Sequence, residues 1–161
     1  MTVDLSVVVV NFQSAALCEG LVASILEDRF EIEGRPANVE VFVVDNASRG
    51  DDVLVLERLA SERTTIVRNT ENIGYALANN QGFAVARGTY HLVVNPDCRV
   101  PKGTLRALID AVDGLSNAGC VGPLASMDEE GEVLLPPNES PDPYREHLVQ
   151  LARRSSTLAD Y

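Results

Sequence analysis

Short apolar runs alternate with longer segments of helical periodicity along most of the chain. The runs are rich in β-branched residues, which predicts strands buried on both faces. Apolar residues three and four positions apart predict helices between them. The predicted strands are 5–10, 39–44, 65–67, 90–94 and 120–124, and the predicted helices lie near 17–26, 52–60, 74–86 and 102–115. This alternation indicates an α/β fold with a mostly parallel sheet.

The pattern weakens after residue 124. Residues 127–135 predict a hairpin, and four prolines within residues 136–143 predict an irregular connector. Residues 144–158 contain few apolar anchors and predict at best a marginal helix. We therefore expect one domain over residues 1–135, followed by an irregular tail with a short helix over residues 136–161.

Polar residues stand where the predicted strands end. Asn11 and Asp45 close the first two strands, Asn72 precedes a helix, and Asn95 and Asp97 follow the strand before the last. In open parallel sheets ligands bind beyond the carboxyl ends of the strands. We therefore expect these side chains to converge on one site.

The segment from Asn72 to Gly82 is the most informative of these strand ends. A glycine at a strand-to-helix turn, here Gly74, lets backbone N–H groups approach an anion such as a diphosphate. Small alanines beside Asn79 and Asn80 leave room for a ribose against the helix. The alternative is an ordinary loop glycine followed by solvated asparagines.

Two carboxylates suggest further chemistry. Asp45 could accept a hydrogen bond from a pyrimidine imide or a ribose hydroxyl, or it could be a turn residue. Asp97, in the tripeptide Asn95-Pro96-Asp97, offers an oxygen ligand for Mg²⁺ or Mn²⁺. Few protein ligands are needed there, because magnesium also takes waters and substrate phosphates. The alternative for this tripeptide is a proline turn that caps the next helix.

Composition narrows the choice of partner and compartment. Lys and Arg number 13 against 24 Asp and Glu, and the resulting net charge of −11 opposes binding to nucleic acid. Three widely spaced cysteines fit a reducing cytoplasm, and no apolar run reaches the ~18 residues of a membrane span. The chain also lacks a P-loop, a G-x-G-x-x-G fingerprint and a nucleophile elbow. We therefore expect a cytoplasmic protein without a transmembrane segment.

Five segments, taken in order, resemble the GT-A glycosyltransferases of family 2. They are Val7–Asn11, Val43–Ser48, Asn72–Gly82, Ala86–Tyr90 and Asn95–Asp97. The run from Asn72 to Asp97 is most similar to the subgroup of dTDP-rhamnosyl and related transferases of bacterial surface polysaccharides. This resemblance covers roughly residues 4–124. It implies a Rossmann-like, three-layer α/β/α fold and inverting transfer from a nucleoside diphosphate sugar, with a divalent metal on the diphosphate.

The resemblance also implies roles for individual residues. Asp97 would bind Mg²⁺ or Mn²⁺, and Asn95 stands where many relatives have the first aspartate of a D-x-D motif, so a neutral ligand replaces a charged one. The residues implied to bind the nucleotide sugar are Val10, Asn11, Asp45, Asn72, Gly74, Asn80 and Asn95.

Family members continue into an acceptor-binding half with an acidic general base, and no such motif is recognisable after Leu124. We therefore expect a GT-A domain truncated at its acceptor side, to which a second chain could supply the missing half, and we nominate no general base. The expected activity is hexosyl or deoxyhexosyl transfer from a UDP- or dTDP-sugar to a cell-surface or lipid-linked acceptor, in the cytoplasm or peripherally at the inner membrane face. The alternatives are a non-catalytic nucleotide-binding remnant and a subunit of a split transferase. A sugar-phosphate nucleotidyltransferase is disfavoured, because the chain lacks the glycine- and lysine-rich amino-terminal segment of such enzymes.

Overall fold

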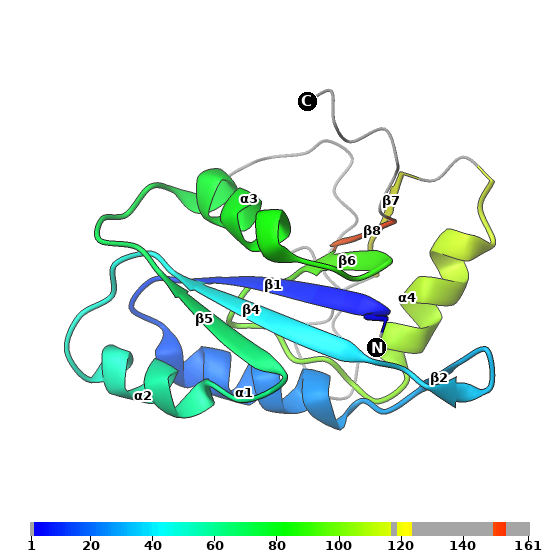
Figure 1. Cartoon of the computed structure of the whole chain (residues 1–161), viewed down its shortest axis with the longest axis horizontal. Helices are drawn as coiled ribbons and strands as arrows, with labels where there is room; N and C mark the ends of the chain where they lie inside the picture. Colours follow the sequence, from blue (N-terminus) through cyan, green and yellow to red (C-terminus); the bar gives the residue numbers. More distant parts are fainter. Residues whose placement is uncertain (1, 117–118, 124–149, 154–161) are drawn as a thin grey trace.

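The computed structural model describes residues 2–116, 119–123 and 150–153 of the chain (Figure 1). The strands within these residues are β1 (Leu5–Asn11), β2 (Glu31–Ile32), β3 (Arg35–Pro36), β4 (Val39–Asp45), β5 (Thr64–Arg68), β6 (Tyr90–Val93), β7 (Cys120–Val121) and β8 (Gln150–Arg153). The helices are α1 (Ala15–Glu27), α2 (Asp51–Leu59), α3 (Tyr75–Val85) and α4 (Thr104–Asp113). None of these helices has the length and hydropathy of a membrane span.

The main sheet has the strand order β5-β4-β1-β6-β8-β7. The strands β5, β4, β1 and β6 are parallel to one another, and β8 runs antiparallel to both of its neighbours. Every residue of β1 and β4 is buried, as expected for strands covered on both faces. The prediction of a mostly parallel α/β sheet is therefore confirmed.

The side chains of β1 alternate between two hydrophobic cores, because successive residues of a strand point to opposite faces. Val7 and Val9 belong to the larger core, which includes buried residues of α1, α2 and α4. Val8 and Val10 belong to a smaller core with α3, which lies across the other face of the sheet (Figure 1). There α3 approaches β1 so closely that a Cβ on Gly82 would collide with the side chain of Val8. The result is a three-layer α/β/α arrangement.

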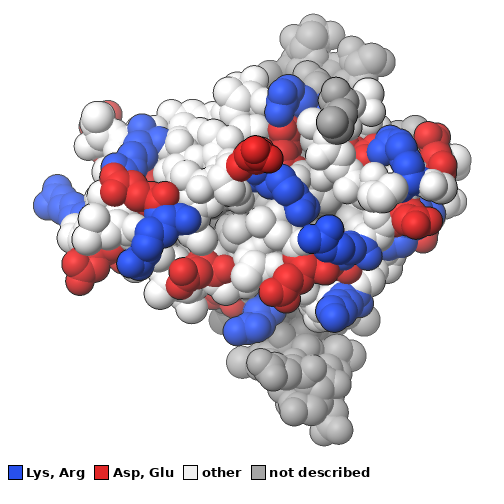
Figure 2. Space-filling model, turned by 60° about the horizontal axis from the view of Figure 1, so that its bottom comes forward, with Lys and Arg blue, Asp and Glu red and all other residues white. Residues whose placement is uncertain are grey.

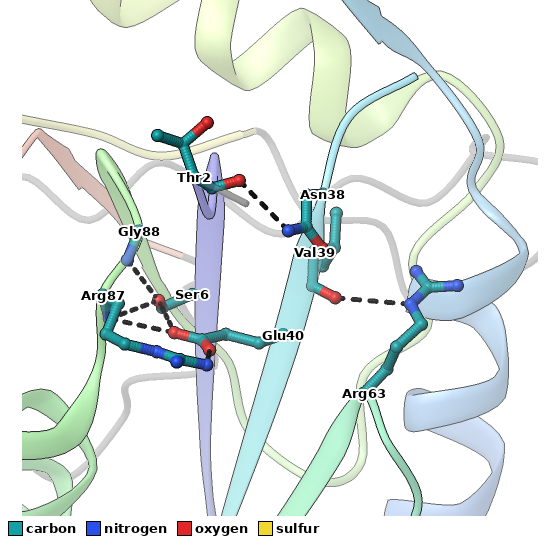
Figure 3. Close-up of polar contacts among 8 residues, drawn as sticks. All are labelled: Thr2, Ser6, Asn38, Val39, Glu40, Arg63, Arg87 and Gly88. Carbon is teal, nitrogen blue, oxygen red and sulfur yellow. Dashed lines mark hydrogen bonds and ion pairs between the residues drawn. The ribbon is translucent and has the colours of Figure 1, made fainter. Parts of the chain in front are cut away.

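A partly buried polar cluster joins β1, β4 and the segment before β6 at the amino-terminal edge of the sheet (Figure 3). The hydroxyl of Ser6 donates to Glu40 at 2.7 Å and accepts from the N–H groups of Arg87 and Gly88 at 3.2 and 2.8 Å. The guanidinium of Arg87 pairs with Glu40 at 2.7 Å. Burial opposes ionisation of Glu40, but hydrogen bonds from Arg87 and Ser6 outweigh it and hold its pKa below the usual range.

The same cluster explains the glycine of the segment Ala86–Tyr90. A Cβ at Gly88 would lie 2.5 Å from the backbone nitrogen of Ser6 and 2.8 Å from its hydroxyl. No side chain fits there without moving β1. This segment, which contributed to the family resemblance, therefore has a packing role at the edge opposite the predicted site.

Two stretches differ from the sequence-based expectation. The polar stretch around Gly34, for which the sequence pattern predicts no helix or strand, forms the two-stranded hairpin of β2 and β3. Gln150–Arg153, inside the region expected to be a marginal helix, forms strand β8 between β6 and β7. Pairing with existing strands overrides a weak local helical pattern. The predicted hairpin at 127–135 and most of the tail lie outside the described residues, so the domain boundary at residue 135 stays a prediction.

Candidate functional site at the carboxyl edge of the sheet

A hollow of about 260 Å³ opens at the carboxyl edge of the sheet. The chain passes from β1 outward through β4 to β5 and then crosses to β6 on the other side of β1. Such a reversal of strand order leaves a crevice at the strand ends, where open α/β sheets bind their ligands. The residues around the hollow are Val10, Phe12, Ser14, Asn46, Asn72, Tyr75, Asn95 and Pro96.

Three residues of the predicted nucleotide-sugar set line this hollow. They come from three different elements: Val10 from β1, Asn72 from the turn before α3, and Asn95 from the segment after β6. Gly74 lies in the same turn as Asn72, and Asn80 is exposed further along α3. The topology therefore gathers residues that are up to 85 positions apart in the sequence around one opening.

Asn11 and Asp45 are buried beside the hollow and connect the two loops that border it. Asn11 is fully buried, and its amide donates to Asp45 Oδ1 at 3.1 Å and to the hydroxyl of Ser48 at 3.0 Å. Its carbonyl oxygen accepts from the hydroxyl of Ser14 at 2.9 Å. The loop after β1 is thereby joined to the loop after β4. Among the described residues, none donates a hydrogen bond to the second carboxylate oxygen of Asp45.

Each of these two loops contains a non-glycine residue in the left-handed region. Gln13 has φ 56° and Ala47 has φ 70°. A left-handed conformation costs such residues about 1–2 kcal/mol. The N–H of Gln13 donates to the hydroxyl of Ser48 at 2.9 Å, so the hydrogen bonds between the loops hold at least one strained turn in place.

Asn46 organises the turn that leads into α3. Its amide nitrogen donates to Asn72 Oδ1 at 2.7 Å, and its carbonyl oxygen accepts from the N–H of Ile73 at 3.0 Å. Asn72 Oδ1 also accepts from the N–H of Gly74 at 3.0 Å. Two backbone donors that the sequence analysis offered to a diphosphate are therefore already hydrogen-bonded. A phosphate at this turn must use donors further along α3 or displace Asn72.

Two exposed aromatic rings flank the hollow. Phe12 is 51% exposed and Tyr75 is 43% exposed. The hydroxyl of Tyr75 donates to Asn95 Oδ1 at 2.9 Å, which connects the start of α3 to the segment after β6. Exposed aromatic rings provide flat apolar surfaces for a sugar or a base. Neither ring stands out in the sequence pattern, although Phe12 directly follows Asn11, where the strand ends.

Comparison with known proteins identifies the family. The model of glycosyl transferase family 2 matches residues 6–156. The chain belongs to this family. No curated protein matches the chain significantly.

Solved structures support the fold of this family 2 domain. It is similar to the mannosyltransferase PcManGT from Pyrobaculum calidifontis, solved in complex with GDP-Man and Mn²⁺, with a TM-score of 0.66 and 24% identity, covering 78% of this chain and 36% of that chain. It is also similar to residues 1-349 of S. aureus TarS, with a TM-score of 0.59 and 22% identity, covering 73% and 34% of the two chains. A second TarS structure has a TM-score of 0.57 and 23% identity, covering 69% and 20%. The GT-A type of α/β fold is thus confirmed, and the chain spans about a third or less of each of these structures.

The donor set around Asn95-Pro96-Asp97 fits a divalent cation only together with a ligand. Within residues 2–116, 119–123 and 150–153 no group of three or more His, Cys, Asp or Glu side chains could hold a metal ion. Asp97 is exposed and Asn95 is half-buried, so the segment offers one carboxylate and one amide. Burial and the charge of Asp97 raise the pKa of the neighbouring Cys98 thiol. A magnesium-type ion would complete its shell with waters and phosphate oxygens.

Proposed function

We propose that this family 2 glycosyltransferase domain binds a nucleoside diphosphate sugar in the hollow at the carboxyl edge of the sheet, for inverting sugar transfer. The observation that carries the proposal is the convergence of two exposed aromatic rings and three asparagines on one opening at the reversal of strand order. The similar mannosyltransferase from Pyrobaculum calidifontis was solved with GDP-Man, which supports a nucleotide sugar as the ligand.

The chemistry of the lining matches the parts of such a ligand. Val10, Phe12 and Tyr75 provide apolar surface for the base and ribose, and the amides of Asn72 and Asn95 can both donate to and accept from hydroxyl groups. The second oxygen of Asp45 is proposed to accept the imide N–H of a pyrimidine, which favours a UDP- or dTDP-sugar. Asn11 supports this role by its bond to Asp45. Gly74 and Asn80 are proposed to line the nucleotide at the start of α3.

Asp97 is proposed to hold Mg²⁺ or Mn²⁺, with the amide of Asn95 beside it. Bound there, the ion would neutralise charge on the diphosphate that leaves in the transfer. The Mn²⁺ in the similar mannosyltransferase supports a divalent ion in this family 2 domain. The hydrogen bond from Tyr75 to Asn95 would orient the amide before a ligand arrives.

The acceptor is proposed to be a cell-surface glycan or a lipid-linked sugar, as in the rhamnosyltransferase-like subgroup, handled in the cytoplasm or at the inner membrane face. None of the residues around the hollow is acidic, so the described lining contains no general base. A further segment or a second chain would have to supply the base and the acceptor site. The absence of an acidic lining residue equally favours the second candidate, a nucleotide-binding subunit without catalysis of its own.

Thermal unfolding with nucleotides tests the proposal. A ligand that binds only the folded state stabilises it by about 2.7 kcal/mol at a concentration one hundred times Kd, and this gain raises the melting temperature. We expect UDP or dTDP to raise it more with Mg²⁺ or Mn²⁺ than without, and Asp97→Asn to remove the metal-dependent part. Glu62→Gln, which removes an exposed carboxylate near the opposite edge of the sheet, is the matched control. Zero shifts with UDP, dTDP and GDP in the presence of metal would exclude a nucleotide site.

A further inference from the structure

A second hollow lies at the opposite, amino-terminal edge of the sheet. Its volume is about 290 Å³, comparable with the hollow at the carboxyl edge and close to the lower end of small-molecule sites. Residues of the α1 carboxyl end, the β2–β3 hairpin and the starts of β4 and β5 surround it. The proposed nucleotide site uses none of these residues.

Two arginines share this hollow without a carboxylate partner. Figure 2 shows one face of the molecule, on which acidic and basic side chains are interspersed. Arg29 and Arg63 both line the hollow, and neither forms an ion pair with a described carboxylate. The two oxygens of Asp28, which also lines it, accept from the N–H groups of Gly103 and Leu105 at 2.6 and 3.0 Å. Asp28 is thus committed to the start of α4.

Arg63 is held in position by the sheet. Its Nε–H donates to the carbonyl oxygen of Val39 at 3.3 Å, and its terminal nitrogens extend away from β4 (Figure 3). Burial and the positive charge of Arg29 lower the pKa of Arg63. Because Arg29 and Arg63 line the same hollow, the fold places two like charges at one opening, and an anion bound between them would reduce their repulsion.

We propose that this hollow binds a phosphate monoester with an apolar ester group. The phosphate would lie between Arg29 and Arg63, since guanidinium groups bind phosphate oxygens by paired, charge-assisted hydrogen bonds. The ester group would contact the apolar side chains of Phe30 and Pro36. Glu31, the remaining acidic residue of the lining, opposes the anion and limits its affinity.

Titration with phenyl phosphate, followed by backbone amide NMR shifts, tests the proposal. We expect shifts at the α1 carboxyl end and the β2–β3 hairpin, and weaker binding of inorganic phosphate. Arg29→Gln should weaken phenyl phosphate binding about tenfold, roughly the loss of one charge-assisted hydrogen bond. Glu31→Gln should strengthen it several-fold. Arg58→Gln, an exposed arginine of α2 without a described partner, removes the same charge and should change nothing.

The outcomes separate this site from the nucleotide site. Binding of phenyl phosphate should be unchanged by saturating UDP with Mg²⁺, and competition between the two would overturn the proposal. Equal losses in Arg29→Gln and Arg58→Gln, or shifts confined to the carboxyl edge, would also overturn it. Arg63→Gln serves as a second variant, with its melting temperature as a check because it also loses the bond to Val39. Vesicles of phosphatidylcholine with phosphatidic acid distinguish the source: Arg29-dependent sedimentation indicates a lipid phosphate, and binding of phenyl phosphate alone indicates a soluble ester.

Discussion

Replacing Asn46 by aspartate should uncouple the carboxyl end of β4 from the turn into α3. The substitution keeps the shape of the side chain but turns the donor that faces Asn72 Oδ1 at 2.7 Å into an acceptor. One hydrogen bond of about 1 kcal/mol is lost, and two oxygens then face each other at a residue that is only 2% exposed, which adds about 1–3 kcal/mol. We expect unfolding to become easier by about 2–4 kcal/mol, or about 5–15 °C in melting temperature.

The same substitution should weaken nucleotide binding, because the turn containing Asn72 and Gly74 loses its anchor. The assay combines urea unfolding with calorimetric titration of UDP and Mg²⁺ at a temperature where the variant is still folded. Asn69→Asp is the comparison, since Asn69 donates to Asn46 and Gln81 but does not line the hollow. It should lose stability with a smaller loss of nucleotide affinity. Asn46→Asp that unfolds and binds like the wild type would refute the role given to this network.

Three further substitutions test other parts of the structure. Glu40→Gln should lower the free energy of unfolding by about 1–3 kcal/mol at pH 7. Because the pKa of Glu40 is lowered in the folded state, its stabilisation is present above the unfolded-state pKa and is lost as the pH falls through the folded-state pKa. The free energies of urea unfolding of the wild type and the variant should therefore become equal in acid. Gly82→Ala should destabilise the protein by about 1–3 kcal/mol, because the added methyl group collides with β1. Gly20→Ala, at a helical position with room for a methyl group, should stabilise it by up to about 1 kcal/mol. Melting temperatures of the two variants that shift in the same direction would contradict the packing argument. Phe12→Ala should weaken nucleotide binding about tenfold with little change in melting temperature, and Leu17→Ala, equally exposed on α1, should leave the affinity unchanged.

The sequence by itself determined the layers of the fold. Four consecutive apolar residues in each of 7–10 and 41–44 are typical of strands covered on both faces, and helical spacing between such strands favours a parallel sheet. Each of the eight predicted elements from residue 5 to residue 115 is present with ends shifted by a few residues at most. The polar residues at strand ends also predicted a site at the carboxyl edge of the sheet, where the hollow opens.

The hydrogen-bond partners of the polar residues at that edge were decided by the tertiary structure. Asp45 and Asn46 are adjacent at the end of β4, yet the first bonds to Asn11 in the loop after β1 and the second bonds to Asn72 before α3. Neighbouring side chains at a strand end point to opposite faces of the sheet. Which residue lies within hydrogen-bonding distance on each face depends on how the connections between the strands are arranged. The sequence could therefore indicate that both are polar strand-end residues, but it could not say which one lines the hollow.

Contacts between segments that are distant in the sequence also could not be predicted from the local pattern of apolar and polar residues. Strand β8 is fixed by hydrogen bonds to β6 and β7, and the exposed ring of Tyr75 reaches Asn95 twenty residues later. Arg29 and Arg63 are ordinary charged residues in the sequence, and they share a hollow only because α1 ends where β5 begins. The periodicity of apolar residues indicates which face of each segment is buried in the core. Contacts between side chains depend on how the segments are arranged in space, and a short stretch of sequence does not contain that information.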